Sequence, residues 1–319
     1  MLKKVIIDCD PGIDDAMAIL LAHRCKDLEI LGITTVHGNA DIENTTANTL
    51  HLRNVFNIDA PVHQGAGLPL NGVELAYPTF VHGDDGMGDT GDVQSDASAD
   101  STEAEQFIVD TIRANPHEVT IITLGRLTNL ARALTIAPEL ATLTKEVVIM
   151  GGAFGENQFR GNVSPCAEAN IYGDPDAADA VCLAGWQKTF VGLDVTMLVV
   201  VDPQRQAKFR QSDDTACQFI GRISEFYNNF YTSIGYTEGF PMHDASAVAY
   251  VIAPELFRVQ TGPVRVATNG IAKGETILNR EPAREYVEDH WADIPAANVC
   301  IGVEAAGVLD VYEHTILGP

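Results

Sequence analysis

The chain has little positive charge. Its 319 residues carry 20 Lys and Arg against 44 Asp and Glu, which gives a formal net charge of −24. Wrapping nucleic acid and docking on anionic lipid both need surplus Lys and Arg. Long hydrophobic runs are also missing, because the longest apolar stretches, such as 17–22 and 197–201, fall far below the roughly 18 residues of a membrane span. We therefore expect no nucleic-acid partner and no membrane partner.

Cysteine is scarce and shows no pattern. The six cysteines contain no Cys-x-x-Cys pair, which argues against a zinc site built from them. Residues 1–8 reach an acidic side chain after three apolar ones, so they are not typical of a signal peptide. We expect reduced, mostly buried thiols in a cytoplasmic protein. With 46% hydrophobic residues, the chain has enough apolar content for a packed core and is not a disordered sequence.

Strand-like and helix-like segments alternate along the chain. Short runs rich in β-branched residues predict strands over 5–7, 30–36, 119–124, 146–150, 189–193, 264–267 and 299–303. Helical spacing of apolar residues predicts helices over 14–24, 43–56, 127–134, 176–184, 213–231 and 244–252. The alternation is typical of an α/β protein with an open, mostly parallel sheet covered by helices on both faces. We expect a single domain over residues 1–319, in which 82–100 forms a surface loop.

Four carboxylates lie within eight residues at the end of the first predicted strand: Asp8, Asp10, Asp14 and Asp15. Ligands of parallel α/β sheets bind outside the carboxyl ends of the strands, which is where these acids fall. Like charges this close repel, and a helix dipole offsets only about 1 kcal/mol for each. A cation among them would relieve the repulsion. Hard carboxylate oxygens with no neighbouring His or Cys favour Ca²⁺ or Mg²⁺ over zinc.

Two other interpretations of this acidic cluster compete with a metal site. The acids could simply cap a helix, but one Asp is enough for a cap. The spacing Asp8-x-Asp10 also matches a phosphatase nucleophile. In that case Asp14 and Asp15 would face the incoming phosphate, which is electrostatically unfavourable.

The stretch Asp8-x-Asp10-Pro11-Gly12-x-Asp14-Asp15-Ala16 closely resembles the signature of the inosine-uridine-preferring nucleoside hydrolase family. Further motifs follow in the family's order at 37–39, 127–131, 150–152, 162, 168–170, 174–178 and 243–245. The resemblance covers essentially the whole chain, and an ordered set of motifs is far more specific than one. It implies a metal-dependent N-glycosidase with an open α/β fold that cleaves the bond between ribose and base in ribonucleosides.

The resemblance also implies roles for the residues at matching positions. A Ca²⁺ cofactor would be held by Asp10, Asp15, Asp244 and the backbone carbonyl of Leu124. Asp10 is the predicted general base, because Ca²⁺ acidifies water only weakly and a neighbouring carboxylate should take the proton. The residues expected to bind the ribose hydroxyls are Asp14, Asn39, Asn162, Glu168 and Asn170.

The leaving base is expected to meet histidine and tyrosine side chains. His243 resembles the family histidine that protonates or hydrogen-bonds the base, and its neighbour Asp244 favours this role over a structural one. His82 lies in a segment similar to the family loop near the base, although an exposed loop histidine is commonly just solvated. Tyr227 and Tyr231 share a helix face, so a base contact and a core stripe are about equally supported.

The predicted function is Ca²⁺-dependent hydrolysis of inosine/uridine-type ribonucleosides, purine and/or pyrimidine, to ribose and free base. Two alternatives stay open: a pyrimidine-specific (cytidine/uridine) hydrolase, and a non-catalytic homologue that binds nucleoside or ribose. The expected partner is a small-molecule ribonucleoside. By analogy with the family, we expect a homodimer or homotetramer.

Overall fold

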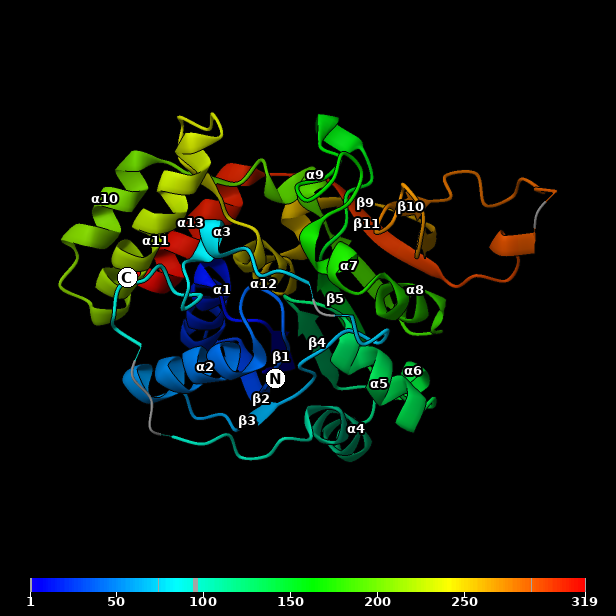
Figure 1. Cartoon of the computed structure of the whole chain (residues 1–319), viewed down its shortest axis with the longest axis horizontal. Helices are drawn as coiled ribbons and strands as arrows, with labels where there is room; N and C mark the ends of the chain where they lie inside the picture. The colour runs from blue at the N-terminus through cyan, green and yellow to red at the C-terminus, as the bar shows by residue number, and fades with distance from the viewer. Residues whose placement is uncertain (1, 74, 94–96, 288, 319) are drawn as a thin grey trace.

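The computed structural model describes residues 2–73, 75–93, 97–287 and 289–318. A nine-stranded sheet has the order β10-β9-β11-β6-β5-β4-β1-β2-β3 (Figure 1). Its strands are β1 Lys3–Cys9, β2 Leu28–Thr35, β3 Val62–Gln64, β4 Val119–Thr123, β5 Glu146–Met150, β6 Lys188–Val191, β9 Phe257–Val266, β10 Thr276–Leu278 and β11 Ala296–Val303. The strands β3, β2, β1, β4, β5, β6 and β11 are neighbours in that order and are all parallel. Strand β9 runs antiparallel to both of its neighbours, β11 and β10. Strands β7 (Val200–Val201) and β8 (Phe240–Pro241) form a separate antiparallel pair.

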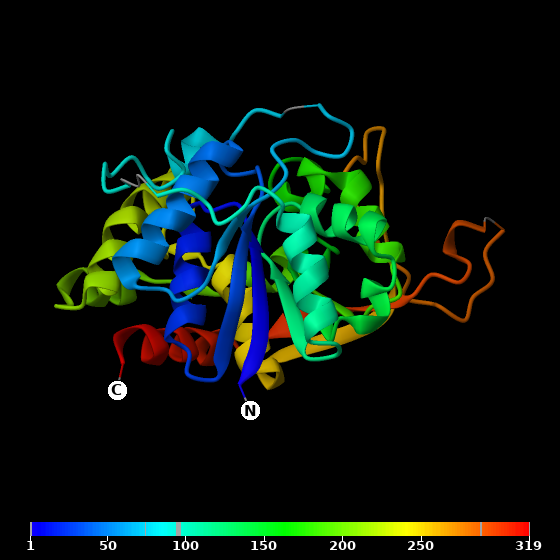
Figure 2. The same ribbon diagram turned by 90° about the horizontal axis from the view of Figure 1, so that it is seen from below.

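Helices cover both faces of this sheet (Figure 2). One face carries α1 Ile13–Arg24, α2 Ile42–Phe56, α11 Thr215–Ser233, α12 Asp244–Ile252 and α13 Ala305–Leu317. The other carries α4 Ala104–Ala114, α5 Thr128–Ile136, α6 Leu140–Leu143 and α8 Pro175–Leu183. The remaining helices are α3 Thr79–His82, α7 Ala169–Gly173, α9 Leu193–Thr196, α10 Pro203–Gln211 and the 3₁₀ turns Glu156–Gln158, Pro254–Leu256 and Asp289–Trp291.

The central strands are apolar on both sides, which explains how one sheet supports two hydrophobic cores. In β1, Val5 and Ile7 pack with α1 and α12, whereas Ile6 packs with the helices of the opposite face. Successive side chains of a strand point to opposite faces, so a continuous apolar run buries both. The run ends at Asp8 and Asp10, which places the acids at the carboxyl end of the strand.

The α/β fold class with a mostly parallel, helix-covered sheet is confirmed, and each predicted helix and strand is present with shifted ends at most. The longest helices that were not predicted are α4, α10 and α13. A capping side-chain hydrogen bond begins α10 but neither α4 nor α13, so a missing start signal does not account for all three. No described helix is long and apolar enough to cross a membrane.

The predicted surface loop over 82–100 is only partly correct. His82 is the last residue of α3 and is 5% exposed, and Met87 is fully buried in the core on the α1 side. The carboxylate of Asp100 anchors the far end of the segment by accepting from the Val62 backbone N–H at 2.8 Å. Residues 94–96 of the predicted loop lie outside the described residues. All six cysteines are free and five are buried, in agreement with the expected mostly buried thiols.

Candidate active site

The site lies where the strand order reverses, between β1 and β4. Adjacent crossovers diverge at such a point and leave a crevice at the carboxyl ends of the strands. A cavity of about 350 Å³ opens there, within the size range of small-molecule sites. It is lined by every predicted site residue except Asp10 and Asp15, which lie beneath it. Residues far apart in sequence are thus brought to one place.

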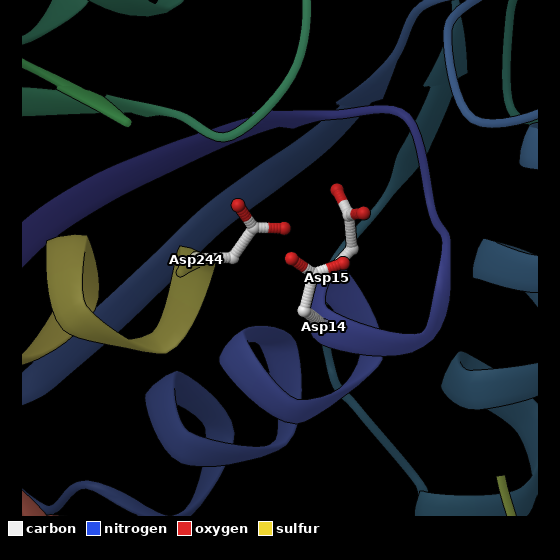
Figure 3. A group of neighbouring side chains, drawn as sticks. All are labelled: Asp14, Asp15 and Asp244. Carbon is white, nitrogen blue, oxygen red and sulfur yellow. The ribbon is translucent and has the colours of Figure 1, made fainter. Parts of the chain in front are cut away.

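Three buried carboxylates face one another at the floor of the site (Figure 3). Asp14 and Asp15 come from the first turn of α1, and Asp244 is the first residue of α12. One oxygen from each lies within 4.8 Å of the others. Acids at helix N-termini benefit from the helix dipole, yet that effect is too small to balance three buried charges. The group therefore has the donor chemistry of a cation site.

Asp10 is held beside this group by close backbone packing. Its Oδ2 accepts from the Asn39 backbone N–H at 2.9 Å. A Cβ added at Gly38 would lie 1.7 Å from that Oδ2, and one at Gly125 would lie 2.5 Å from Oδ1. Only glycine leaves room for the carboxylate at these two positions. The buried Oδ1 of Asp10 has no hydrogen-bond partner among the described residues.

Hydrogen bonds tie Asp10 and Asp15 together. The Asn39 side-chain amide donates to Asp15 Oδ2 at 2.9 Å, so one asparagine contacts both acids. The Gly12 backbone N–H donates to the same Asp15 oxygen at 2.9 Å. The Asp10 backbone N–H donates to Asp15 Oδ1 at 3.2 Å. Asp15 is therefore rigidly placed by backbone donors that precede it in sequence.

Burial dominates the electrostatics of these acids. It raises the pKa of Asp15 to about 7, with the charge of Asp14 adding to the effect. Burial also raises the pKa of Asp10 and Asp244 well above the usual range, and the neighbouring acids reinforce both shifts. The Arg126 guanidinium opposes the shift at Asp10. A cluster that resists ionisation this strongly is stabilised when a cation is present.

The residues present fit a hard divalent ion. The donors are all oxygens, and buried Asp10 Oδ1 and Asp14 Oδ1 lack a partner within the described chain. The Leu124 carbonyl, the fourth predicted ligand, lines the pocket and accepts from Asn170 Nδ2 at 2.7 Å. The three carboxylates that lie close together are Asp14, Asp15 and Asp244, whereas the predicted ligand set has Asp10 in place of Asp14. Asp10 as a metal ligand stays a prediction.

A second wall of the pocket carries the remaining predicted ribose contacts. Glu168 is almost fully buried and caps α7 by accepting from the backbone N–H groups of Asn170 and Ile171 at 2.9 and 3.2 Å. Its Oε2 also accepts from Gly152 N–H at 3.0 Å. Asn162 is exposed and lies on the segment that leads back to this helix. Burial raises the pKa of the Glu168 carboxyl.

Another part of the pocket wall holds the neutral imidazole of His243, which is bonded to two hydroxyls. His243 Nε2 lies 2.7 Å from the Tyr231 hydroxyl, and its Nδ1 lies 2.7 Å from the Thr196 hydroxyl. Burial lowers the pKa of His243 to about 4. The Tyr227 hydroxyl donates to Asp14 Oδ2 at 3.1 Å, which connects this part of the wall to the acids. Both tyrosines pack in the core and line the pocket, so the core interpretation is confirmed and a contact with the base stays a prediction.

His82 is a pocket residue with a fixed ring. Its Nδ1 accepts from the Ile13 backbone N–H at 3.2 Å, and the same nitrogen lies 4.0 Å from Asp14 Oδ1. Burial lowers the pKa of His82 to about 3. The expectation that a histidine in this loop could be merely solvated is wrong, because α3 folds the ring inward against α1.

Sequence reasoning missed three buried polar residues around the site. Thr196 bonds the ring of His243, and Asp194, on the same short helix, bonds backbone groups of the 154–156 turn. Arg126 lies close enough to Asp10 to influence its pKa. A usable signal existed, since Asp194 and Thr196 directly follow a predicted strand at the same edge of the sheet as the acids.

These features define an α/β protein with a strand-end pocket lined by buried acids and imidazoles. A family model described as inosine-uridine preferring nucleoside hydrolase matches residues 5–310. The chain belongs to this family, whose members are enzymes that hydrolyse the N-glycosyl bonds of ribonucleosides.

The chain is similar over its full length to curated and solved members. It is 36% identical over 317 residues to a probable uridine nucleosidase 1 of Oryza sativa subsp. japonica, covering 99% of this chain and 97% of the relative. It is 38% identical over 284 residues to an inosine-uridine preferring nucleoside hydrolase of Leishmania major, covering 88% of each. A solved plant nucleoside hydrolase superposes with a TM-score of 0.95 at 35% identity, covering 100% of both chains.

Proposed function

We propose that this chain is a Ca²⁺-dependent hydrolase of inosine/uridine-type ribonucleosides that yields ribose and a free base. One observation carries the proposal: a single pocket combines an acidic end, where Asp10 Oδ1 and Asp14 Oδ1 are buried without a partner among the described residues, with an imidazole end formed by the hydroxyl-bonded ring of His243. The first end suits a cation and a sugar diol. The second suits a heterocyclic leaving group that must accept a proton or a hydrogen bond.

The metal ligands in this proposal are Asp10, Asp15, Asp244 and the carbonyl of Leu124. A bound Ca²⁺ would supply positive charge that lowers the pKa of water and attracts the 2′- and 3′-hydroxyls. Asp10 then acts as the general base that takes the proton of the attacking water. Its Oδ1 is the buried oxygen without a partner, so it is the atom free to accept that proton.

The ribose is held by Asp14, Asn39, Asn162, Glu168 and Asn170. The transition state of glycoside hydrolysis has oxocarbenium character, and positive charge develops on the sugar ring. Carboxylate and amide oxygens aimed at that ring stabilise the developing charge because they are already fixed by the fold. Glu168 illustrates this, since three backbone N–H groups orient its carboxylate.

Departure of the base is assisted by His243, with His82, Tyr227 and Tyr231 contacting the base. The 2.7 Å contact between Tyr231 and His243 Nε2 gives a hydroxyl–imidazole pair at this end of the pocket. Thr196 at Nδ1 keeps the ring from rotating. These side chains supply a proton or a hydrogen bond to the leaving base, which is a role for general acid catalysis.

A pyrimidine-specific hydrolase is the second candidate for base preference. It is favoured by relatives of the chain at 36% identity, which are named uridine nucleosidases. The broader candidate is favoured by the relatives named inosine-uridine preferring. Steady-state kinetics over five ribonucleosides, with kcat/KM for each, decide between the two.

Ribose release from inosine, uridine and cytidine, with and without chelator, tests the proposal itself. We expect release that chelator abolishes and Ca²⁺ restores. Binding of a nucleoside in calorimetry with no ribose release, in folded and metal-loaded protein, would instead establish the non-catalytic homologue.

We further propose that residues 1–319 form one domain and act as a homodimer or homotetramer in the cytoplasm. The single sheet running from Lys3 to Val303 supports one domain. Free, mostly buried thiols support a reducing compartment. Light scattering of the purified protein measures the assembly.

A further inference from the structure

We propose that Asp194 is a positioning residue that holds one wall of the substrate pocket, the segment 152–168, in its working shape. The inference rests on the proposed function and extends it to a residue that contacts no substrate. Asp194 lies in the first turn of α9 and is fully buried. No Lys or Arg within the described chain forms an ion pair with it, so its bonds to the 152–168 wall are its principal stabilisation.

Asp194 fastens the first turn of this wall with three hydrogen bonds. Its Oδ2 accepts from Phe154 N–H at 2.9 Å, and its Oδ1 accepts from Glu156 N–H at 2.6 Å. Its own carbonyl accepts from the Asn157 side-chain amide at 2.7 Å. Figure 1 shows α9 beside the 3₁₀ turn Glu156–Gln158. One residue thus satisfies three donors of a turn that has no regular secondary structure on either side.

The wall is a closed loop, so fixing its start also places its end. Gly152 N–H donates to Glu168 Oε2 at 3.0 Å, and Leu193 N–H donates to Gly152 O at 2.9 Å. The segment therefore leaves the end of β5 beside α9, passes over the pocket and returns at Glu168 to Gly152. Between the two ends, residues 159–163 line the cavity, Asn162 among them.

Position in the pocket decides which part of the substrate this wall meets. The acids hold the diol and the imidazoles hold the base, so the exocyclic 5′-hydroxymethyl arm of the ribose faces the remaining wall. That wall carries Asn162 and Glu168. If Asp194 sets the wall, its loss should weaken recognition of the 5′-hydroxyl and leave the chemistry at the anomeric carbon otherwise intact.

Other contacts of the wall are weaker candidates for this role. The Arg280–Glu156 ion pair is 2.6 Å long, but its side chains are 39% and 32% exposed, and exposed pairs contribute little. Thr276 bonds the backbone of Ala153 but not the turn itself. A buried carboxylate that accepts several N–H bonds is the strongest contact among them.

The test compares Asp194→Asn with wild type on uridine and on 5′-deoxyuridine, in the Ca²⁺-loaded full chain. The amide replaces one acceptor oxygen by an NH₂ group that faces an N–H donor. We expect kcat/KM for uridine to fall about 10-fold, as expected for a hydrogen bond to a charged group, mainly through KM. 5′-Deoxyuridine lacks the 5′-hydroxyl. With this substrate the fall in kcat/KM should stay below about 2-fold, because the hydrogen bond to the 5′-hydroxyl is absent even in wild type.

Asp202→Asn is the matched control. Asp202 also accepts a backbone N–H, from Arg205 in α10 at 2.8 Å, but it does not line the pocket. This variant should match wild type on both substrates. Should Asp194→Asn fail to fold, Asn157→Gly removes one of the three contacts and retains the left-handed backbone of that residue (φ 50°). It should show the same substrate dependence with a smaller loss.

Equal losses on both substrates, or an unchanged KM for uridine, overturn the positioning role of Asp194. A wild-type protein that releases ribose from no ribonucleoside overturns the proposed function instead. The two failures are therefore distinguishable.

Discussion

The acidic cluster and the imidazole of His243, which we call the acidic and imidazole ends of the pocket, differ in how far the protein satisfies its own polar groups. At the acidic end, Asp10 Oδ1 and Asp14 Oδ1 are buried without a partner in the described structure, and burial raises the pKa of each acid. At the imidazole end, both nitrogens of His243 have hydroxyl partners. The acidic end therefore has the chemistry to hold a cation, whereas the ring of His243 is already oriented by the chain alone.

This difference predicts that metal removal has the largest effect of any perturbation. Chelation should abolish ribose release and lower the Tm, because an ion at 100 times its Kd stabilises a folded protein by about 2.7 kcal/mol. Asp244→Asn should lose the Ca²⁺-dependent rise in Tm, yet its metal-free form should be more stable than metal-free wild type, since the folded protein no longer buries an acid whose ionisation is disfavoured. Differential scanning calorimetry with and without Ca²⁺ measures both.

Asp176→Asn is the control for that experiment. Asp176 is an exposed acid in the first turn of α8 and lies outside the pocket. It should keep the full Ca²⁺-dependent rise in Tm. If Asp244→Asn also keeps that rise, the acidic end is not a cation site, and the contrast between the acidic and imidazole ends is lost.

Asp10→Asn should have the largest effect of any single substitution on turnover. Removing a general base costs about 10²–10⁴-fold in rate, and this amide is isosteric, so the packing against Gly38 and Gly125 is retained. We expect kcat for uridine to fall within that range, with an unchanged circular dichroism spectrum. Survival of wild-type kcat would remove Asp10 from the mechanism.

His243→Gln tests the imidazole end and should cost about 10²-fold in kcat for uridine, the lower bound for general acid catalysis. With p-nitrophenyl riboside, whose leaving group departs without protonation, the loss should be small. Tyr231→Phe removes only the hydroxyl at Nε2, and a loss of about 1 kcal/mol corresponds to roughly 5-fold. Equal losses of His243→Gln on both substrates would mean that the ring is structural.

The smallest expected effect is on the pH dependence of stability, where the two ends act in opposite directions. In metal-free protein, burial raises the pKa of Asp15 to about 7, so the protonated form is favoured by folding and this stability is lost as pH rises from about 4 to 7. Burial lowers the pKa of His243 to about 4, so its destabilising effect appears as pH falls from about 6.5 to 4.

Thermal melts at pH 5 and pH 7 separate these contributions. In metal-free protein, Asp15→Asn should flatten the decline in Tm toward pH 7, and His243→Gln should raise the Tm at pH 5 relative to that at pH 7. Identical pH profiles for wild type and Asp15→Asn would show that Asp15 titrates normally.

Much of the fold followed from local patterns. Apolar runs ending in acids or glycine located β1, β2, β4, β5 and β6, and helical spacing located α1, α11 and α12, because these segments are long and strongly periodic. The antiparallel β9–β10 pairing and the helices α4, α10 and α13 were not predicted. Short edge strands depend on tertiary contacts, which no local pattern encodes.

The sequence by itself determined the chemistry of this protein: which acids, imidazoles and amides are available, and that they cluster at strand ends. Only the tertiary structure decided how they are partnered. It buried His82, joined Tyr231 and Thr196 to His243, and used Asp194 to hold the pocket wall. The physical reason is that the residue types at strand ends are set by the local sequence. Hydrogen bonds between elements instead need donor–acceptor distances that are correct to within a few tenths of an ångström, and only the packing of the elements sets those distances.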